Sequence, residues 1–290
     1  MELFHTAYGP EDAPRLLVLH GGPGASHDYL LPQMLELARD YRLIFYDQRG
    51  GGRSRSEDRS PITWQTHVED LATLVRELSL EPLTLVGYSW GGLLALLYSI
   101  TVAGGFRDQD IPFSAAIDDA PAPSRMVLIC PAPATTALRA QFSEELAHRQ
   151  RAPWIQQERA AIAASGLRER DPAAFAKRIF ELGVAGYFAD PARARELTPF
   201  RVIGRVQQSV WESLAGYDLT SRLPLITAPT LVLHGAHDAI PLASSQLIAS
   251  ALPRGELVVL DESAHVPYVE GQAAFFAAVR EFLQRTRDQS

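Results

Sequence analysis

Short apolar runs alternate with longer segments of helical pattern along most of the chain. Six of these runs are apolar almost throughout, which is typical of parallel strands covered on both faces. Because segments with helical periodicity separate the runs, the pattern predicts an α/β fold with a mostly parallel, doubly wound sheet. The predicted strands are Leu16–His20, Arg42–Tyr46, Leu83–Gly87, Met126–Ile129, Thr230–His234 and Glu256–Leu260.

Three segments have clear helical patterns. Apolar residues recur at three- and four-residue spacing over residues 68–78, after Thr63, which is a good N-cap residue. Residues 92–100 are apolar nearly all round, which predicts a buried helix. Phe275 and Phe282 mark a final amphipathic helix.

The alternation of strands and helices stops after the fourth predicted strand. From Pro133 to about Leu223 the chain has helical patterns and no good strand. We therefore predict a helical cap, or lid, formed by residues 134–223 and inserted into an α/β core formed by residues 1–133 and 224–290. A second irregular stretch, 102–124, contains several aspartates and three prolines and is interpreted as a surface loop.

Composition excludes some classes of partner. The formal net charge of −7 argues against nucleic acid, which favours a clustered basic surface, and against an anionic membrane. The first twenty residues lack the basic and apolar segments of a signal peptide, and no apolar run reaches the ~18 residues of a spanning helix. The single cysteine, Cys130, lies in an apolar run and is expected to be buried and unreactive. These features predict a cytoplasmic protein.

Ser89 is the strongest candidate for a nucleophile. It lies in Gly87-Tyr88-Ser89-Trp90-Gly91, between a predicted strand and a predicted buried helix. This context matches the nucleophile elbow, a sharp strained turn that exposes a serine Oγ above the sheet. Side chains at Gly87 and Gly91 would collide with the flanking strand and helix. An ordinary serine in a glycine-rich turn is the alternative, and the strand–helix context disfavours it.

A nucleophilic serine needs a general base and an orienting carboxylate. Asp238 and His265 each follow a later predicted strand, in the order Ser, Asp, His that the α/β-hydrolase fold uses. Both lie after the carboxyl ends of strands, where open α/β sheets place their sites. We therefore predict that Ser89, Asp238 and His265 form a catalytic triad, and we interpret His20 and His234 as structural.

A glycine-rich loop, His20-Gly21-Gly22-Pro23-Gly24, follows the first predicted strand. Glycines let backbone N–H groups approach a substrate oxygen closely. We predict that the amides of Gly22 and Trp90 form the oxyanion hole. A second glycine-rich loop, 47–54, lacks the dinucleotide-binding pattern and the P-loop lysine, so it is interpreted as structural.

Together these motifs resemble the proline iminopeptidase family of α/β-hydrolase-fold serine hydrolases. The resemblance implies removal of an N-terminal residue, often proline, from a peptide, with glutamates of the cap holding the substrate's α-amino group. Because a buried ammonium must be paired, we take Glu181 and Glu212 as the best candidates for this role. The residues that carry the resemblance are 20–24, the Asp-Gln-Arg-Gly start of 47–54, and 87–92, with Asp238 and His265 at the remaining triad positions.

Three functions are compatible with these motifs. The first is an aminopeptidase that releases an N-terminal proline or small residue. The second is a carboxylesterase or lactonase for small uncharged substrates, favoured by Ala239, where some relatives carry an acidic residue. The third is a non-catalytic ligand-binding relative, which the complete triad disfavours. The expected partner is a small molecule or short peptide, with no metal and no cofactor, because no histidine or acid cluster has ligand spacing.

Overall fold

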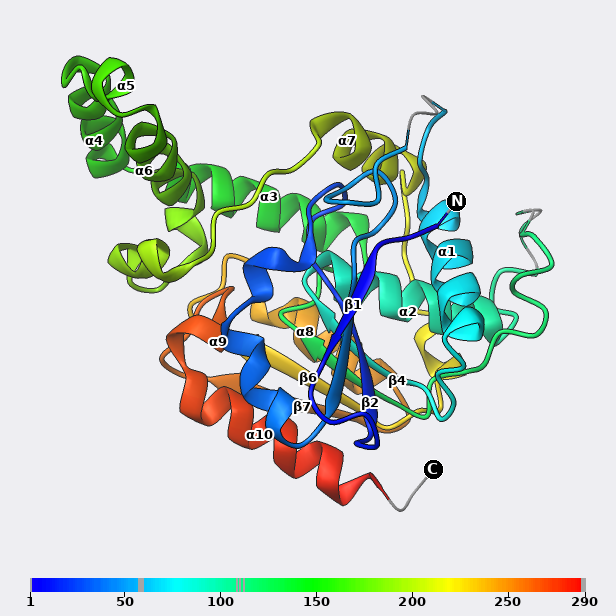
Figure 1. Cartoon of the computed structure of the whole chain (residues 1–290). Coiled ribbons are helices and arrows are strands. Elements are labelled where there is room, and N and C mark those ends of the chain that lie inside the picture. The colour runs from blue at the N-terminus through cyan, green and yellow to red at the C-terminus, as the bar shows by residue number, and fades with distance from the viewer. Residues whose placement is uncertain (1, 57–59, 108, 110, 112, 288–290) are drawn as a thin grey trace.

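A seven-stranded sheet lies at the centre of the computed structural model, which describes residues 2–56, 60–107, 109, 111 and 113–287 (Figure 1). The strand order is β1-β3-β2-β4-β5-β6-β7, and every neighbouring pair is parallel except β1 and β3. The strands are β1 (His5–Tyr8), β2 (Arg15–Leu19), β3 (Arg42–Tyr46), β4 (Thr84–Tyr88), β5 (Arg125–Ile129), β6 (Thr230–Gly235) and β7 (Gly255–Leu260).

The six strands predicted from the sequence are confirmed, each within one residue at either end. β1 was not predicted. It pairs with β3 alone at the edge of the sheet, and its residues are exposed or only half-buried. An edge strand of this kind needs no continuous apolar run, so the pattern that revealed the other strands is missing here.

Helices cover both faces of the sheet. α1 (Trp64–Glu77), α2 (Trp90–Val102) and α8 (Leu242–Ala251) contribute to the core on one face. The other face is covered by the 3-10 helix η2 (Gln33–Arg39), α9 (Pro267–Glu270) and α10 (Gln272–Arg285). Successive strand residues alternate between the two cores, as in β2, where Leu17 and Leu19 face one side and Leu16 and Val18 the other. The sheet is therefore doubly wound, as predicted.

The predicted helices form, each for the expected local reason. Thr63 caps α1 and exchanges hydrogen bonds with Thr66, so both ends of a capping box are present. α2 is buried almost throughout, in keeping with its apolar sequence. Val102 is the last residue of α2, and the rest of the predicted loop 102–124 contains turns but neither helix nor strand at its described positions; residues 108, 110 and 112 lie outside them.

Five α-helices lie between β5 and β6, in the segment 134–223, which we call the helical segment. In Figure 1, α4, α5 and α6 project away from the sheet, while α3 and α7 lie close to it. Within the described part of the chain, no helix is both long and apolar enough to cross a membrane. The helices are α3 (Thr136–Gln150), α4 (Pro153–Ala164), α5 (Leu167–Arg170), α6 (Pro172–Val184) and α7 (Gly204–Ser213), with the 3-10 helices η3 (Ala185–Tyr187) and η4 (Pro191–Glu196) between α6 and α7.

Candidate active site

Ser89 occupies a strained turn between β4 and α2. Its φ of 52° and ψ of −115° lie in a region that residues other than glycine rarely adopt. The turn is this tight because two glycines flank it. A Cβ at Gly87 would lie 2.5 Å from the carbonyl oxygen of Gly91, and a Cβ at Gly91 would collide with the carbonyl of Leu19. The amide of Ser89 donates to the carbonyl of Ile129 at 2.9 Å, which ties the turn to β5.

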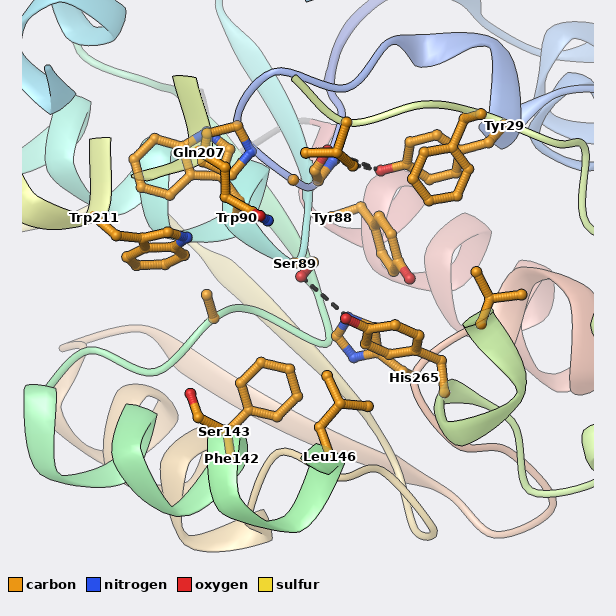
Figure 2. Close-up of a pocket in the computed structure, with 18 of the residues that line it drawn as sticks. Tyr29, Tyr88, Ser89, Trp90, Phe142, Ser143, Leu146, Gln207, Trp211 and His265 are labelled. Carbon is orange, nitrogen blue, oxygen red and sulfur yellow. Dashed lines mark hydrogen bonds between the residues drawn. The ribbon is translucent and has the colours of Figure 1, made fainter. Parts of the chain in front are cut away.

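The structure brings Ser89, His265 and Asp238 into one hydrogen-bonded line. His265 Nε2 lies 3.0 Å from Ser89 Oγ (Figure 2). On the other side of the ring, His265 Nδ1 lies 2.9 Å from Asp238 Oδ2. Burial raises the pKa of Asp238, but His265 and the amide of Ile240 outweigh it, so the pKa is lowered from its usual value. The ionised carboxylate accepts a hydrogen bond from the N–H at Nδ1, which leaves the Nε2 lone pair facing the serine.

Aromatic rings surround the imidazole of His265. The ring centroids of Tyr88, Phe142 and Tyr187 lie 5.3, 6.0 and 5.2 Å from it. Two of these rings come from the helical segment, and the amide of His265 also donates to the carbonyl of Tyr187 at 3.0 Å. The helical segment therefore covers part of the histidine.

The loop that contains Gly22 is held in a defined orientation. Tyr29 Oη accepts from the amide of Gly21 at 2.7 Å and donates to its carbonyl at 3.1 Å, and His20 Nδ1 lies 2.9 Å from the same carbonyl. The Gly21 carbonyl and the Gly22 amide belong to one planar peptide unit, so both bonds also orient the Gly22 N–H. No hydrogen bond to another described residue occupies that amide. The Trp90 amide, the first of α2, has no partner within its helix.

Gln48 links this loop to Trp90. Its amide donates to His20 Nε2 at 3.1 Å, its side-chain Nε2 donates to the carbonyl of His20 at 2.8 Å, and its Oε1 accepts from Trp90 Nε1 at 2.7 Å. Burial lowers the pKa of His20 to about 4, so the ring is neutral. Because its Nε2 accepts, the proton lies on Nδ1 and points to Gly21. The loop 47–54 is structural, as predicted, but sequence reasoning missed Gln48.

A cavity of about 850 Å³ opens at Ser89. In Figure 2, Trp211 and Gln207 lie on one side of Ser89 and Tyr29 on the other. Aromatic and aliphatic side chains dominate the wall, which is typical of small-molecule sites. The lining residues are Gly21, Gly22, Pro23, Tyr29, Tyr88, Ser89, Trp90, Ala132, Pro133, Arg139, Phe142, Ser143, Leu146, Phe180, Gly183, Val184, Tyr187, Leu197, Phe200, Val202, Gly204, Gln207, Gln208, Trp211, Glu212, His265 and Val266.

Only one of the two predicted substrate-binding glutamates lies in this wall. Glu212, on α7, lines the cavity and accepts a hydrogen bond from Gln208 Nε2 at 2.7 Å. Glu181 does not line it. Its carboxylate pairs with the guanidinium of Arg178 at 2.9 Å, one turn earlier on α6. The expectation for Glu181 is therefore corrected: the phase of α6 directs this side chain to an ion pair outside the cavity.

Sequence reasoning also missed a stripe of α3. Arg139, Phe142, Ser143 and Leu146 all line the cavity, and their spacing of three and four residues places them on one face of the helix. That spacing was visible in the sequence. What it could not indicate is that this face lies over Ser89, because the direction of α3 depends on the packing of the whole helical segment.

The thiol of Cys130 lies beside the triad. The ligand atoms of Cys130, Asp238 and His265 are within 4.8 Å of one another, which is close enough to consider a metal site. Burial raises the pKa of the Cys130 thiol well above its usual value, so it stays protonated and is a poor metal ligand. Asp238 and His265 are also bonded to each other. This donor set therefore fits a hydrogen-bonded triad better than a metal centre.

Comparisons with known proteins agree with this geometry. A family model described as "Alpha/beta hydrolase family" matches residues 16–279. The proline iminopeptidase of Saccharolobus solfataricus is 26% identical over 98% of this chain and 90% of its own, and that of Heyndrickxia coagulans is 29% identical over 92% and 90%. The resemblance to proline iminopeptidases is therefore confirmed over almost the whole chain.

Solved structures show the same fold. A proline iminopeptidase from Mycobacterium smegmatis superposes with a TM-score of 0.66 at 22% identity, covering 98% of this chain and 95% of its own. An enol-lactonase from Burkholderia xenovorans superposes with a TM-score of 0.62, also at 22% identity, covering 97% and 96%. Structural similarity at this level of identity is shared by hydrolases with different substrates, so the fold alone does not select one.

Proposed function

The chain belongs to the alpha/beta hydrolase family, and we propose that it is a serine aminopeptidase that releases an N-terminal proline or small residue from short peptides. One observation carries the reaction class: the line of hydrogen bonds from Asp238 through His265 to Ser89, with distances of 2.9 and 3.0 Å. A nucleophile, a base and an orienting carboxylate in this order are the requirements for acyl transfer through a covalent intermediate.

In the proposed reaction, Ser89 Oγ attacks the carbonyl carbon of the scissile amide while His265 Nε2 takes the serine proton. Asp238 stabilises the imidazolium that forms. The amides of Gly22 and Trp90 donate to the oxyanion. His265 then gives its proton to the departing amine, and the C–N bond breaks to leave an acyl ester on Ser89. Water, deprotonated by His265, attacks this ester, releases the amino acid and returns the proton to Ser89.

Three features support an aminopeptidase. Glu212 places a carboxylate in the cavity wall, where it would pair with the substrate's ammonium. The helical segment contributes much of that wall, which limits the substrate to a short chain. Several similar curated proteins are named proline iminopeptidases.

A carboxylesterase or lactonase is the second candidate. Glu212 is the only acidic side chain among the residues that line the cavity, and most of the others are aromatic, aliphatic or glycine. Such a wall also accepts an uncharged acyl group or a lactone. Ala239, next to Asp238, adds no further carboxylate. The same triad and oxyanion amides would cleave an ester by the same steps.

A paired substrate panel tests the proposal. We expect hydrolysis of prolyl- and alanyl-4-nitroanilides, abolished in Ser89→Ala. Glu212→Gln should raise KM for these substrates and leave KM for 4-nitrophenyl acetate unchanged, because only the nitroanilides carry an ammonium. Glu181→Gln, outside the cavity, is the matched control and should change neither. Ester turnover without any nitroanilide cleavage would refute the aminopeptidase and favour the esterase.

A further inference from the structure

Arg139 is a cation in the wall of the Ser89 cavity that the proposed reaction does not use. It lies on the cavity-facing stripe of α3, one turn before Phe142. Its guanidinium carbon lies over the ring of Trp211, 4.2 Å from the centroid. Trp211 belongs to α7 and lines the cavity as well.

No carboxylate of the described residues lies within ion-pair distance of Arg139. Two other arginines of the helical segment differ in this respect, since Arg149 pairs with Glu145 at 2.7 Å and Arg178 pairs with Glu158 at 2.9 Å. A guanidinium stacked on an indole uses only its face. Its N–H groups point outward in the plane and stay available for a planar acceptor such as a carboxylate.

We propose that Arg139 binds a carboxylate of the substrate, so that the cavity selects substrates with a negative charge near the bond that is cleaved. This inference rests on the proposed hydrolysis at Ser89. Neutral polar groups lie in the same wall, with Gln207 and Gln208 on α7 and Ser143 on α3. The side-chain amides of Gln207 and Gln208 would donate further hydrogen bonds to the bound carboxylate without competing for it by charge, whereas the Ser143 hydroxyl already donates to the backbone carbonyl of Arg139 at 3.0 Å.

The distance from Arg139 to the reacting atoms suits a short substrate. The ring of Phe142 lies 6.0 Å from that of His265, and Arg139 lies about 4.5 Å further along the helix axis, since each helical residue rises ~1.5 Å. A carboxylate one or two residues from the scissile carbonyl lies roughly 4–7 Å from it, because an extended chain advances about 3.5 Å per residue. The arginine side chain spans the remaining distance.

Arg139 and Glu212 then have complementary roles. Glu212 is the residue after Trp211, on which Arg139 stacks, and both charges line the same cavity. A substrate that carries both an ammonium and a carboxylate satisfies both of them. A substrate with only an ammonium leaves Arg139 unpaired. Its ammonium and the Arg139 guanidinium also repel each other, because both are positively charged.

The carboxylate could belong to either product of the cleavage, and two matched substrate pairs distinguish these sources. Glutamyl- and glutaminyl-4-nitroanilide differ only by a carboxylate on the acyl side. Prolyl-alanine and prolyl-alaninamide differ only by a carboxylate on the departing amine. We expect kcat/KM to favour the carboxylate member of at least one pair by about tenfold or more, the typical effect of a charge-assisted hydrogen bond.

Arg139→Gln should remove that preference by lowering kcat/KM for the carboxylate member of the pair towards that of its neutral partner. Arg168→Gln is the matched control, because Arg168 also stacks on an aromatic ring of the helical segment, that of Phe175, but does not line the Ser89 cavity. It should retain the wild-type preference. Equal kcat/KM within both pairs, or a preference that survives Arg139→Gln, would overturn the proposal.

Failure of the aminopeptidase proposal gives a different result, namely no cleavage of any of the four amides. In that case the dipeptide and its amide are compared as inhibitors of 4-nitrophenyl acetate hydrolysis, together with glutamate and glutamine. Tighter inhibition by one carboxylate member, lost in Arg139→Gln, supports the role of Arg139 in an esterase. Equal inhibition within both pairs overturns it.

Discussion

Replacing Tyr29 by phenylalanine tests whether the Gly22 amide depends on a hydroxyl for its orientation. The substitution removes one oxygen and keeps the ring, which packs against Phe200 and Tyr88 with centroids 4.3 and 6.0 Å away. The Gly21 amide loses its acceptor, and the Gly21 carbonyl loses one of the two donors that hold the Gly21–Gly22 peptide. His20 remains as the second donor.

The expected effect on catalysis follows from this arrangement. Removing an entire oxyanion donor raises the barrier by about 3–4 kcal/mol. Tyr29→Phe keeps the Gly22 amide and one of the two bonds that orient it, so about half of that cost, roughly 1.5 kcal/mol, is expected. This corresponds to a decrease of about tenfold in kcat. The free energy of unfolding should also fall by about 1–3 kcal/mol, because the Gly21 amide is left without a partner.

Steady-state kinetics on a cleaved substrate, with urea denaturation beside it, check both numbers. Tyr46→Phe is the control, since the Tyr46 hydroxyl is equally buried and has no hydrogen-bond partner among the described residues. It should leave kcat unchanged and the free energy of unfolding unchanged or increased. If Tyr29→Phe alters kcat by less than twofold, the hydroxyl does not orient the oxyanion amide. If only KM rises, it contacts the substrate instead.

Two predictions concern buried polar groups. Gln48→Leu leaves Trp90 Nε1 and the His20 carbonyl without partners. Urea denaturation should therefore show a loss of about 2–6 kcal/mol in the free energy of unfolding, at ~1–3 per group. The control Gln157→Leu, at an exposed position of α4, should cost less than about 1 kcal/mol, and an equal loss in both variants would refute the role of Gln48. Burial lowers the pKa of His67 to about 3, so below about pH 6.5 the unfolded chain binds a proton that the folded protein does not, and stability falls by ~1.4 kcal/mol per pH unit. Because burial also lowers the pKa of His20, His67→Leu should reduce the measured slope between pH 6.5 and 4 by about this amount and leave the remainder. An unchanged slope in urea denaturation would contradict the lowered pKa of His67.

The sequence predicted that Ser89, Asp238 and His265 lie close together, because each of them follows the end of a strand. Ser89, Asp238 and His265 each follow a continuous apolar run, and parallel strands bring their carboxyl ends to one edge of the sheet. The order of the three residues along the chain then matched one fold. No knowledge of side-chain contacts was needed, so the prediction of their proximity succeeded from periodicity and motif alone.

The residues around the triad could not be predicted in this way. Gln48 contacts Trp90, which lies 42 residues away in the sequence, through a bond that no local pattern encodes. Glu181 and Glu212 look alike in the sequence, since both are glutamates in helical stretches. What separates them is helix phase: Val206 and Val210 bury one face of α7 and so place Glu212 in the cavity wall. In α6, the carboxylate of Glu181 forms an ion pair with Arg178 and does not line the cavity.

The position of His265 depends on the helical segment as much as on the sheet. The carboxylate of Glu270 accepts from the amide of Ala264, at 2.8 Å, and from the amide of Ala189, at 2.7 Å, and so joins the histidine loop to the segment after η3. The His265 amide donates to the carbonyl of Tyr187. Each bond to the carboxylate contributes about 1.5–3 kcal/mol. Displacing residues 187–190 would break the bond from Ala189 to Glu270 and the bond from His265 to Tyr187, and would leave His265 without its support from the helical segment. An opening movement of the cavity can leave His265 beside Ser89 only if residues 187–190 stay in place. Such a movement must therefore occur in another part of the cavity wall.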